Sequence, residues 1–220
     1  MLPGGQGNQL VKTVIEFPWH HAKREYQLGY SLSLLALQSA DPDNALSALD
    51  IARTGETVEY GDAPLMGYAM PNGWYLIVAN KCDHRLLDAK LLQRVSETYR
   101  VIACSIEEHV MFSSAEEWQA GKQIWRAEHM GEDGPINLKT SGTLPPSFAA
   151  MEQEFRAKQE AEGGKEADVD YYFEIPLTAA QTIMGFKHDE EVPGVNPEEF
   201  ELLSDSASTP AAKSRWKFWK

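Results

Sequence analysis

The sequence predicts an α+β fold: a mainly antiparallel sheet with helices packed on one face, an N-terminal helical pair and a disordered C-terminal tail. Short apolar runs bounded by turn residues fill the middle of the chain and are typical of strands. Two of them flank Asn72-Gly73, a strong hairpin signal because both residues tolerate positive φ. Segments of helical periodicity precede and follow these runs. The 220 residues are 43% apolar, so one domain with a substantial core is expected.

The N-terminal third is predicted to begin with nine loose residues, followed by a strand over 10–17. Residues 20–40 carry both an alternating and a helical pattern of apolar side chains. The helical interpretation is favoured because a helix follows, with Asp41 as its cap, Pro42 in its first turn and Gly55 at its end. These two segments form the predicted helical pair. The residues that carry the two patterns are Leu28, Tyr30, Leu32, Leu34, Leu35 and Ala36.

The middle of the chain is predicted to form the sheet, interrupted by one helix. The run 74–79 is apolar throughout, which indicates a central strand covered on both faces. The helix is expected to begin at its cap, Asp83, and to end at about Glu97. Ala120-Gly121 is expected to form the turn into the last of these strands. The predicted strands are 66–70, 74–79, 101–104, 110–112 and 123–129.

The C-terminal part is predicted to contain two helices and a strand. The first helix opens at Pro145-Pro146 and breaks at Gly163-Gly164. Its outer face carries two pairs of opposite charge four residues apart: Glu152–Arg156 and Glu154–Lys158.

A cleanly alternating strand over 170–175 and a helix over 176–184 should follow, with Gly185 closing that helix. The domain is expected to span residues 1–203. Residues 204–220 then form a flexible linker with a basic-aromatic tail.

The formal net charge of −13 is unevenly distributed. Residues 151–203 carry 14 Asp and Glu against 4 Lys and Arg, a net charge of −10. Residues 204–220 carry 1 against 4, a net charge of +3. The acidic body argues against nucleic acid, whose phosphates it would repel. It suits a basic protein partner, which its field would steer inward, and it also suits solubility alone.

The sequence predicts a cytoplasmic protein. No run approaches the roughly 20 apolar residues that cross a membrane, and the N-terminus lacks the basic and apolar regions of a secretory signal. Only two cysteines occur, Cys82 and Cys104, and both lie in or beside apolar runs. Buried thiols in a reducing compartment fit this pattern.

One constellation could carry chemistry: Glu107-Glu108-His109, between two apolar strand segments. Two carboxylates beside an imidazole could raise the pKa of the histidine or supply a general base. The alternative is a solvated strand end with a structural histidine. No phosphate-binding, nucleophile-elbow or zinc motif is present, so no cofactor and no metal site is predicted. His188 and the acidic residues after it are predicted to form a polar loop.

The tail interleaves aromatic and basic residues. Exposed tryptophan is uncommon enough to indicate a binding role. Three destinations fit: the surface of an anionic bilayer, to which one short segment binds weakly, a groove of another protein, or the acidic body of the chain itself. The candidate partner-binding residues are Arg215, Trp216, Lys217, Phe218 and Trp219.

Two stretches of the chain look like segments from a group of uncharacterised bacterial proteins. One runs from 104 to 125 and contains Glu-Glu-His-Val-Met; the other runs from 169 to 189 and contains Phe-Glu-Ile-Pro and Gly-Phe-Lys-His-Asp. The resemblance implies a bacterial cytoplasmic protein and brings no activity or catalytic residue with it.

Three functional hypotheses follow. The favoured one is a non-catalytic acidic protein that binds a basic partner, as an immunity or antitoxin-type inhibitor does. The second is a hydrolase that uses Glu107, Glu108 and His109. The third is a peripheral adaptor whose C-terminal tail touches a membrane or a larger assembly. The strong charge and the sparse catalytic motifs favour binding over catalysis.

Overall fold

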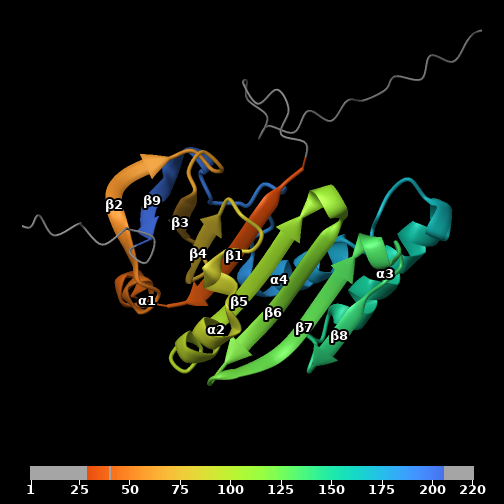
Figure 1. The fold of residues 1–220 in the computed structure, drawn as a ribbon, viewed down its shortest axis with the longest axis horizontal. Coiled ribbons are helices and arrows are strands. Elements are labelled where there is room, and N and C mark those ends of the chain that lie inside the picture. The colour runs from red at the N-terminus through yellow and green to blue at the C-terminus, as the bar shows by residue number, and fades with distance from the viewer. Residues whose placement is uncertain (1–28, 40, 206–220) are drawn as a thin grey trace, which may run out of the picture.

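The computed structural model describes residues 29–39 and 41–205, which form a nine-stranded antiparallel sheet with helices on both faces (Figure 1). The strand order is β2-β9-β3-β4-β1-β5-β6-β7-β8. The strands are β1 (Ser31–Gln38), β2 (Ile51–Val58), β3 (Leu65–Ala69), β4 (Trp74–Ala79), β5 (Arg100–Glu107), β6 (Phe112–Gln119), β7 (Lys122–Met130), β8 (Lys139–Gly142) and β9 (Phe200–Asp205). The α-helices are α1 (Pro42–Ala48), α2 (Ala89–Val95), α3 (Phe148–Ala161) and α4 (Glu174–Met184). The 3-10 helices are η1 (Arg85–Leu87), η2 (Glu108–Val110), η3 (Gly131–Asp133), η4 (Gly164–Glu166) and η5 (Pro197–Glu199).

The sheet separates two hydrophobic cores, because side chains alternate between its faces along each strand. Residues of α3 and α4 share one core with Leu34 and Leu76. Residues of α1 and α2 share the other core with Leu35 and Ile77. Figure 1 shows α4 behind the sheet and α2 in front of it. The predicted α+β class and antiparallel sheet are confirmed, but the helices cover both faces rather than one.

The predicted hairpin is confirmed as β3 and β4. Asn72 Oδ1 accepts a hydrogen bond from the Trp74 backbone N–H at 3.3 Å, and Gly73 has a φ of 86°. All six residues of β4 are buried between β3 and β1, as its unbroken apolar run predicts. The predicted turn at Ala120-Gly121 likewise joins β6 to β7.

The two C-terminal helices are also confirmed. In α3, Arg156 Nη2 lies 2.7 Å from Glu152 Oε1, and Lys158 Nζ lies 2.7 Å from Glu154 Oε1, as the i,i+4 spacing predicts. The second helix, α4, ends at Gly185, whose φ is 76°.

The N-terminal helical pair is wrong in its first member, because residues 31–38 form β1. This strand lies between β4 and β5, where both faces of the sheet are covered. A strand buried on both sides carries apolar residues on both faces, so the alternation that separates strand from helix is lost. The second member, α1, has the predicted cap at Asp41 but ends at Ala48. Gly55 lies in β2, at an irregularity in its pairing with β9.

Three further assignments differ from the structure. The helix expected to begin at Asp83 is η1 followed by α2, with Asp88 as the helix cap. The strand expected over 110–112 begins only at Phe112 and continues to Gln119 as β6. The alternating segment 170–175 is a turn that leads into α4.

The C-terminal end of the described chain completes the sheet. β9 runs through Asp205, so the predicted domain boundary at residue 203 falls inside a strand. The expected strand over 10–17, the loose N-terminus and the tail over 206–220 lie outside the described residues.

Candidate functional site

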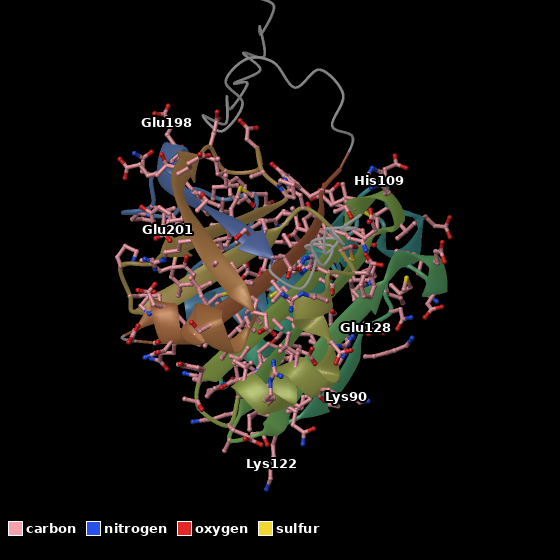
Figure 2. The ribbon with its side chains drawn as sticks, turned by 60° about the vertical axis from the view of Figure 1, so that its left-hand side comes forward. Lys90, His109, Lys122, Glu128, Glu198 and Glu201 are labelled. Atoms are coloured by element: carbon pink, nitrogen blue, oxygen red, sulfur yellow. The ribbon has the colours of Figure 1, made fainter. Side chains whose placement is uncertain are left out.

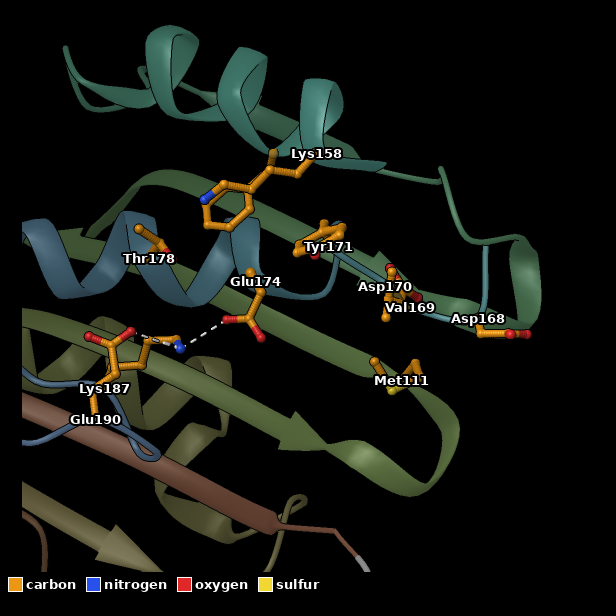
Figure 3. A pocket seen from close by; sticks show the side chains of 11 residues that line it. Met111, Lys158, Asp168, Val169, Asp170, Tyr171, Glu174, Thr178, Lys187 and Glu190 are labelled. Carbon is orange, nitrogen blue, oxygen red and sulfur yellow. Dashed lines mark hydrogen bonds and ion pairs between the residues drawn. The ribbon is translucent and has the colours of Figure 1, made fainter. Parts of the chain in front are cut away.

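An open pocket of about 550 Å³ lies where η2 and β6, α3, α4 and the loops around α4 meet (Figure 3). Its lining combines charged residues with an apolar wall. The lining residues are Met111, Phe155, Lys158, Asp168, Val169, Asp170, Tyr171, Glu174, Thr178, Lys187 and Glu190.

The charged part of the pocket is organised around Lys187, which is 5% exposed. Its Nζ lies 2.9 Å from Glu174 Oε2, 2.8 Å from Asp189 Oδ1 and 3.0 Å from Glu190 Oε1. Figure 3 shows the Glu174 carboxylate pointing at this ammonium group. Burial alone would lower the pKa of Lys187, but the surrounding carboxylates, Glu174 foremost, more than offset this and raise it. Lys187 is therefore a fixed cation, unsuited to act as a base or nucleophile near neutral pH.

The loop before α4 is held by Gln159, a fully buried residue of α3. Its Nε2 donates to the carbonyl oxygens of Gly164 at 2.8 Å and Val169 at 3.0 Å. Its Oε1 accepts from the Tyr171 backbone N–H at 2.8 Å. One side chain thus satisfies three backbone groups of a segment that makes no sheet.

Asp170, a residue of the same loop, joins it to the sheet. Its Oδ1 accepts hydrogen bonds from the backbone N–H groups of Tyr172 and Phe173 at 3.1 and 3.2 Å. Its Oδ2 lies 2.9 Å from Nε2 of His129, a fully buried residue of β7. The other ring nitrogen of His129 lies 2.5 Å from the Asn137 carbonyl oxygen. This chain of contacts fixes the pocket wall to the sheet.

Two of the three sequence-predicted residues pair with each other beside this pocket. His109 Nδ1 lies 2.5 Å from Glu107 Oε1, and Ser31 Oγ donates to Glu107 Oε2 at 2.7 Å. The hydrogen bond from Ser31 is the largest contribution that lowers the pKa of Glu107, and His109 adds to it. Figure 2 shows His109 at the periphery of the molecule. The pair lies at the surface, at the end of β5.

Glu108 turns away from this pair and joins different elements. Its Oε1 lies 3.0 Å from His188 Nε2, and its Oε2 accepts from the Tyr30 backbone N–H at 2.7 Å. The Tyr30 ring packs edge-on against the His188 ring, with 5.1 Å between the ring centres. His188 is buried, so the loop predicted to be merely polar is tied into the fold. The structure therefore separates the trio into two carboxylate–histidine contacts.

Neither contact activates a nearby nucleophile. Ser31 Oγ donates its hydrogen to Glu107 rather than to an imidazole, and it accepts from the Cys82 backbone N–H at 3.2 Å. Burial, with the Glu107 charge second, raises the pKa of the Cys82 thiol to about 11, so it stays protonated near neutral pH. Within residues 29–39 and 41–205, no three His, Cys, Asp or Glu residues are arranged to hold a metal ion.

Sequence reasoning missed the residues that build the pocket. Lys187, which lines the pocket, and the neighbouring His188 belong to the Gly-Phe-Lys-His-Asp stretch, for which the sequence predicts a helix end, a polar loop and a family resemblance that brings no site residue. Gln159 lies on a helix where a polar residue is ordinary, and no local pattern indicates that it is buried. The candidate tail residues 215–219 lie outside the described residues, so the structure does not place them.

No family model, curated protein or solved structure matches this chain. None of the helices in the described part is long and apolar enough to span a membrane.

Proposed function

We propose that this chain is a non-catalytic, acidic binding protein that occupies a basic protein partner in the bacterial cytoplasm, as an immunity or antitoxin-type inhibitor does. The observation that carries the proposal is the surplus of carboxylates in and around the α3–α4 layer. Residues 151–203 carry the net charge of −10, and −7 of it lies in residues 151–191, which hold most of α3, all of α4 and the loops around them.

Ion pairs within this region do not cancel its charge. The two cations of α3 pair with Glu152 and Glu154. Lys187 faces three carboxylates, which leaves that cluster with a surplus of two negative charges. Glu160, Glu162 and Glu166 are exposed around the end of α3. A field of one sign on one side of a protein steers an oppositely charged partner toward that side.

The chemistry of the histidine contacts supports binding over catalysis. A general base needs a substrate proton or nucleophile within reach, and the hydroxyl and thiol near Glu107 are respectively engaged and protonated. Glu108 is engaged in joining β1 to the loop after α4.

The test measures association with the partner, identified by co-purification from the native cell and then purified. We expect the association rate to fall as ionic strength rises, because screening shortens the field to about 8 Å at physiological salt. The triple variant Glu160→Lys, Glu162→Lys, Glu166→Lys should slow association by about tenfold or more at low salt.

A matched control reverses three exposed charges elsewhere: Glu56→Lys, Glu59→Lys and Glu97→Lys. Both variants change the net charge equally, so a larger effect of the first shows that position matters. An association rate that is insensitive to salt, or equally slow in both variants, contradicts the proposal.

The hydrolase alternative rests on one observation, the Glu107 carboxylate that orients His109 through Nδ1. If this pair is a general base, His109→Gln should lower a hydrolytic rate by about 10²–10⁴-fold in a folded protein. Our proposal expects the same variant to bind the partner as the parent does. The peripheral-adaptor hypothesis depends on residues 215–219 and stays a prediction.

A further inference from the structure

One large apolar side chain stands exposed in the lining of the pocket, and a second stands exposed next to a lining residue in the sequence. In the described part of the chain, Val110 and Val169 are the only large hydrophobic residues classed as exposed, at 40% and 43%. Val169 lines the pocket, and Val110 directly precedes Met111, which also lines it. They come from segments far apart in the sequence, η2 and the loop before α4. Apolar groups exposed at a polar-rimmed hollow are typical of interaction sites.

The pocket is electronegative. Four carboxylates line it, against two ammonium groups. Both cations are already paired, Lys158 with Glu154 and Lys187 with its three acidic neighbours. Asp168 is exposed and has no hydrogen bond or ion pair among the described residues. Its carboxylate is therefore available to a ligand.

We propose that this pocket docks a cationic segment of the protein partner, in which an arginine or lysine stands next to an aliphatic residue. This inference rests on the proposed function and names the place on the molecule where the partner binds. The aliphatic stem of the basic side chain would lie on Met111 and Val169, and its charged head would reach Asp168 at the pocket mouth. The neighbouring aliphatic residue would cover Val110.

Charge complementarity selects this occupant over a second copy of the chain. Two copies would bring two acidic α3–α4 layers together, and like charges face to face disfavour association. An uncharged apolar segment would bury the valines but would leave the Asp168 carboxylate partly desolvated without a partner.

The test uses two synthetic heptapeptides, one with a single arginine between two leucines and one with citrulline in its place. Citrulline keeps the shape of the side chain and removes its charge. Each is titrated into the full chain, and binding is followed through the NMR methyl signals of Val110, Met111 and Val169. The arginine peptide should shift these signals, and the citrulline peptide should bind about two- to fivefold more weakly, as expected for one exposed charge pair.

Variants separate charge from position. Asp168→Asn should weaken the arginine peptide by about two- to fivefold and leave the citrulline peptide unchanged. Glu56→Gln, which removes one exposed charge from β2, should change neither. Val169→Ser should weaken both peptides, because it removes apolar contact rather than charge. Each substituted side chain is exposed, so the fold should be retained.

Equal binding of the two peptides, shifts confined to other methyl groups, or an Asp168→Asn variant that binds like the parent would each overturn the docking proposal. The proposed function fails by a different result, a partner association rate that is insensitive to salt. A third result is that neither peptide binds while charge reversal at Glu160, Glu162 and Glu166 still slows association with the partner. That result would show that the acidic layer is the binding face and that the pocket does not hold the partner.

Discussion

The two faces of the sheet are stabilised in different ways. On the α1–α2 face the helices pack through aliphatic residues such as Leu46 and Leu92, and the main ion pair, Arg85 with Asp205, lies at its margin. On the α3–α4 face, buried polar groups lie inside the layer itself, among them Gln159 and Lys187.

The difference follows from what each face carries. The α1–α2 face holds short helices, and the carbonyl oxygens at the end of α1 accept hydrogen bonds from the side chains of Arg85 and Arg94. The α3–α4 face also holds long loops, and buried loop backbone needs side-chain partners. The pocket is built from these loops. A binding surface on this fold therefore depends on a few buried polar side chains, and substitutions in them should affect the pocket first.

The largest effect is expected from Gln159→Leu. The substitution keeps a similar volume but leaves three backbone groups of the loop before α4 without a partner, which should cost about 2–4 kcal/mol. Chemical denaturation gives the loss of stability, and hydrogen exchange should show faster exchange at Tyr171. The matched control, Gln93→Leu on α2, changes an exposed side chain and should shift stability by no more than about 0.5 kcal/mol. Equal effects of the two would remove the distinction between the faces.

On the other face, Arg85→Leu should cost about 2 kcal/mol. Arg85 donates to both carboxylate oxygens of Asp205 and to the Leu49 carbonyl oxygen, so its loss removes three hydrogen bonds and takes the guanidinium away from a mostly buried carboxylate. The double variant with Asp205→Asn should recover part of the loss. The methyl signals of Val110 and Val169 should stay unchanged in both, and a shift there would show that the two faces are coupled.

A third prediction concerns acid. Burial alone would raise the pKa of Asp189, but the charges of His188 and Lys187 more than offset this and lower it. A carboxyl group whose pKa is lower in the folded state stabilises the fold above its unfolded pKa of about 3.9, and this contribution is lost as pH falls toward the folded pKa. Denaturation measured over a pH series should show a shallower acid loss in Asp189→Asn than in the parent.

The control is Asp83→Asn. Asp83 pairs with Lys81 at 2.9 Å, and this hydrogen bond chiefly lowers its pKa, but both side chains are well exposed. Solvent screening should leave this pair little influence on stability, so the acid profile of Asp83→Asn should follow that of the parent. If both variants flatten the profile equally, the buried position of its partner Lys187 is not what gives Asp189 its effect.

Local signals predicted those parts of the fold whose cause is local. Asn72-Gly73 specifies its hairpin, and the run 74–79 specifies a strand covered on both faces. The sequence did not predict β1 as a strand. Its apolar residues point to both faces of the sheet, so its pattern resembles that of a helix as much as that of a strand. The segment 170–175 carries an alternating pattern, but the hydrogen bonds of Asp170 to Tyr172 and Phe173 hold its first part in a turn, and α4 begins at Glu174.

The sequence predicted the region of the site but not the contacts within it. Glu107, Glu108 and His109 are consecutive, yet Glu107 and His109 pair with each other while Glu108 contacts other elements. Glu108 meets His188, which is 80 residues away in sequence. A contact of that separation has no local pattern, so no single-sequence argument could have paired them.

The smallest expected effect tests whether surface pairs matter to the acidic layer. Glu152 and Arg156 form the i,i+4 pair of α3, and the Arg156 guanidinium also lies 5.6 Å from the centre of the Tyr172 ring. A double-mutant cycle with Glu152→Gln and Arg156→Gln should give a coupling of about 0.3–0.5 kcal/mol that falls at high salt. Arg156→Gln alone should cost slightly more than Glu152→Gln, because it also removes the contact with the ring. A coupling well above 1 kcal/mol would show that α3 is held by its surface charges as strongly as by its buried polar groups, and the contrast between buried and surface contacts drawn above would no longer hold.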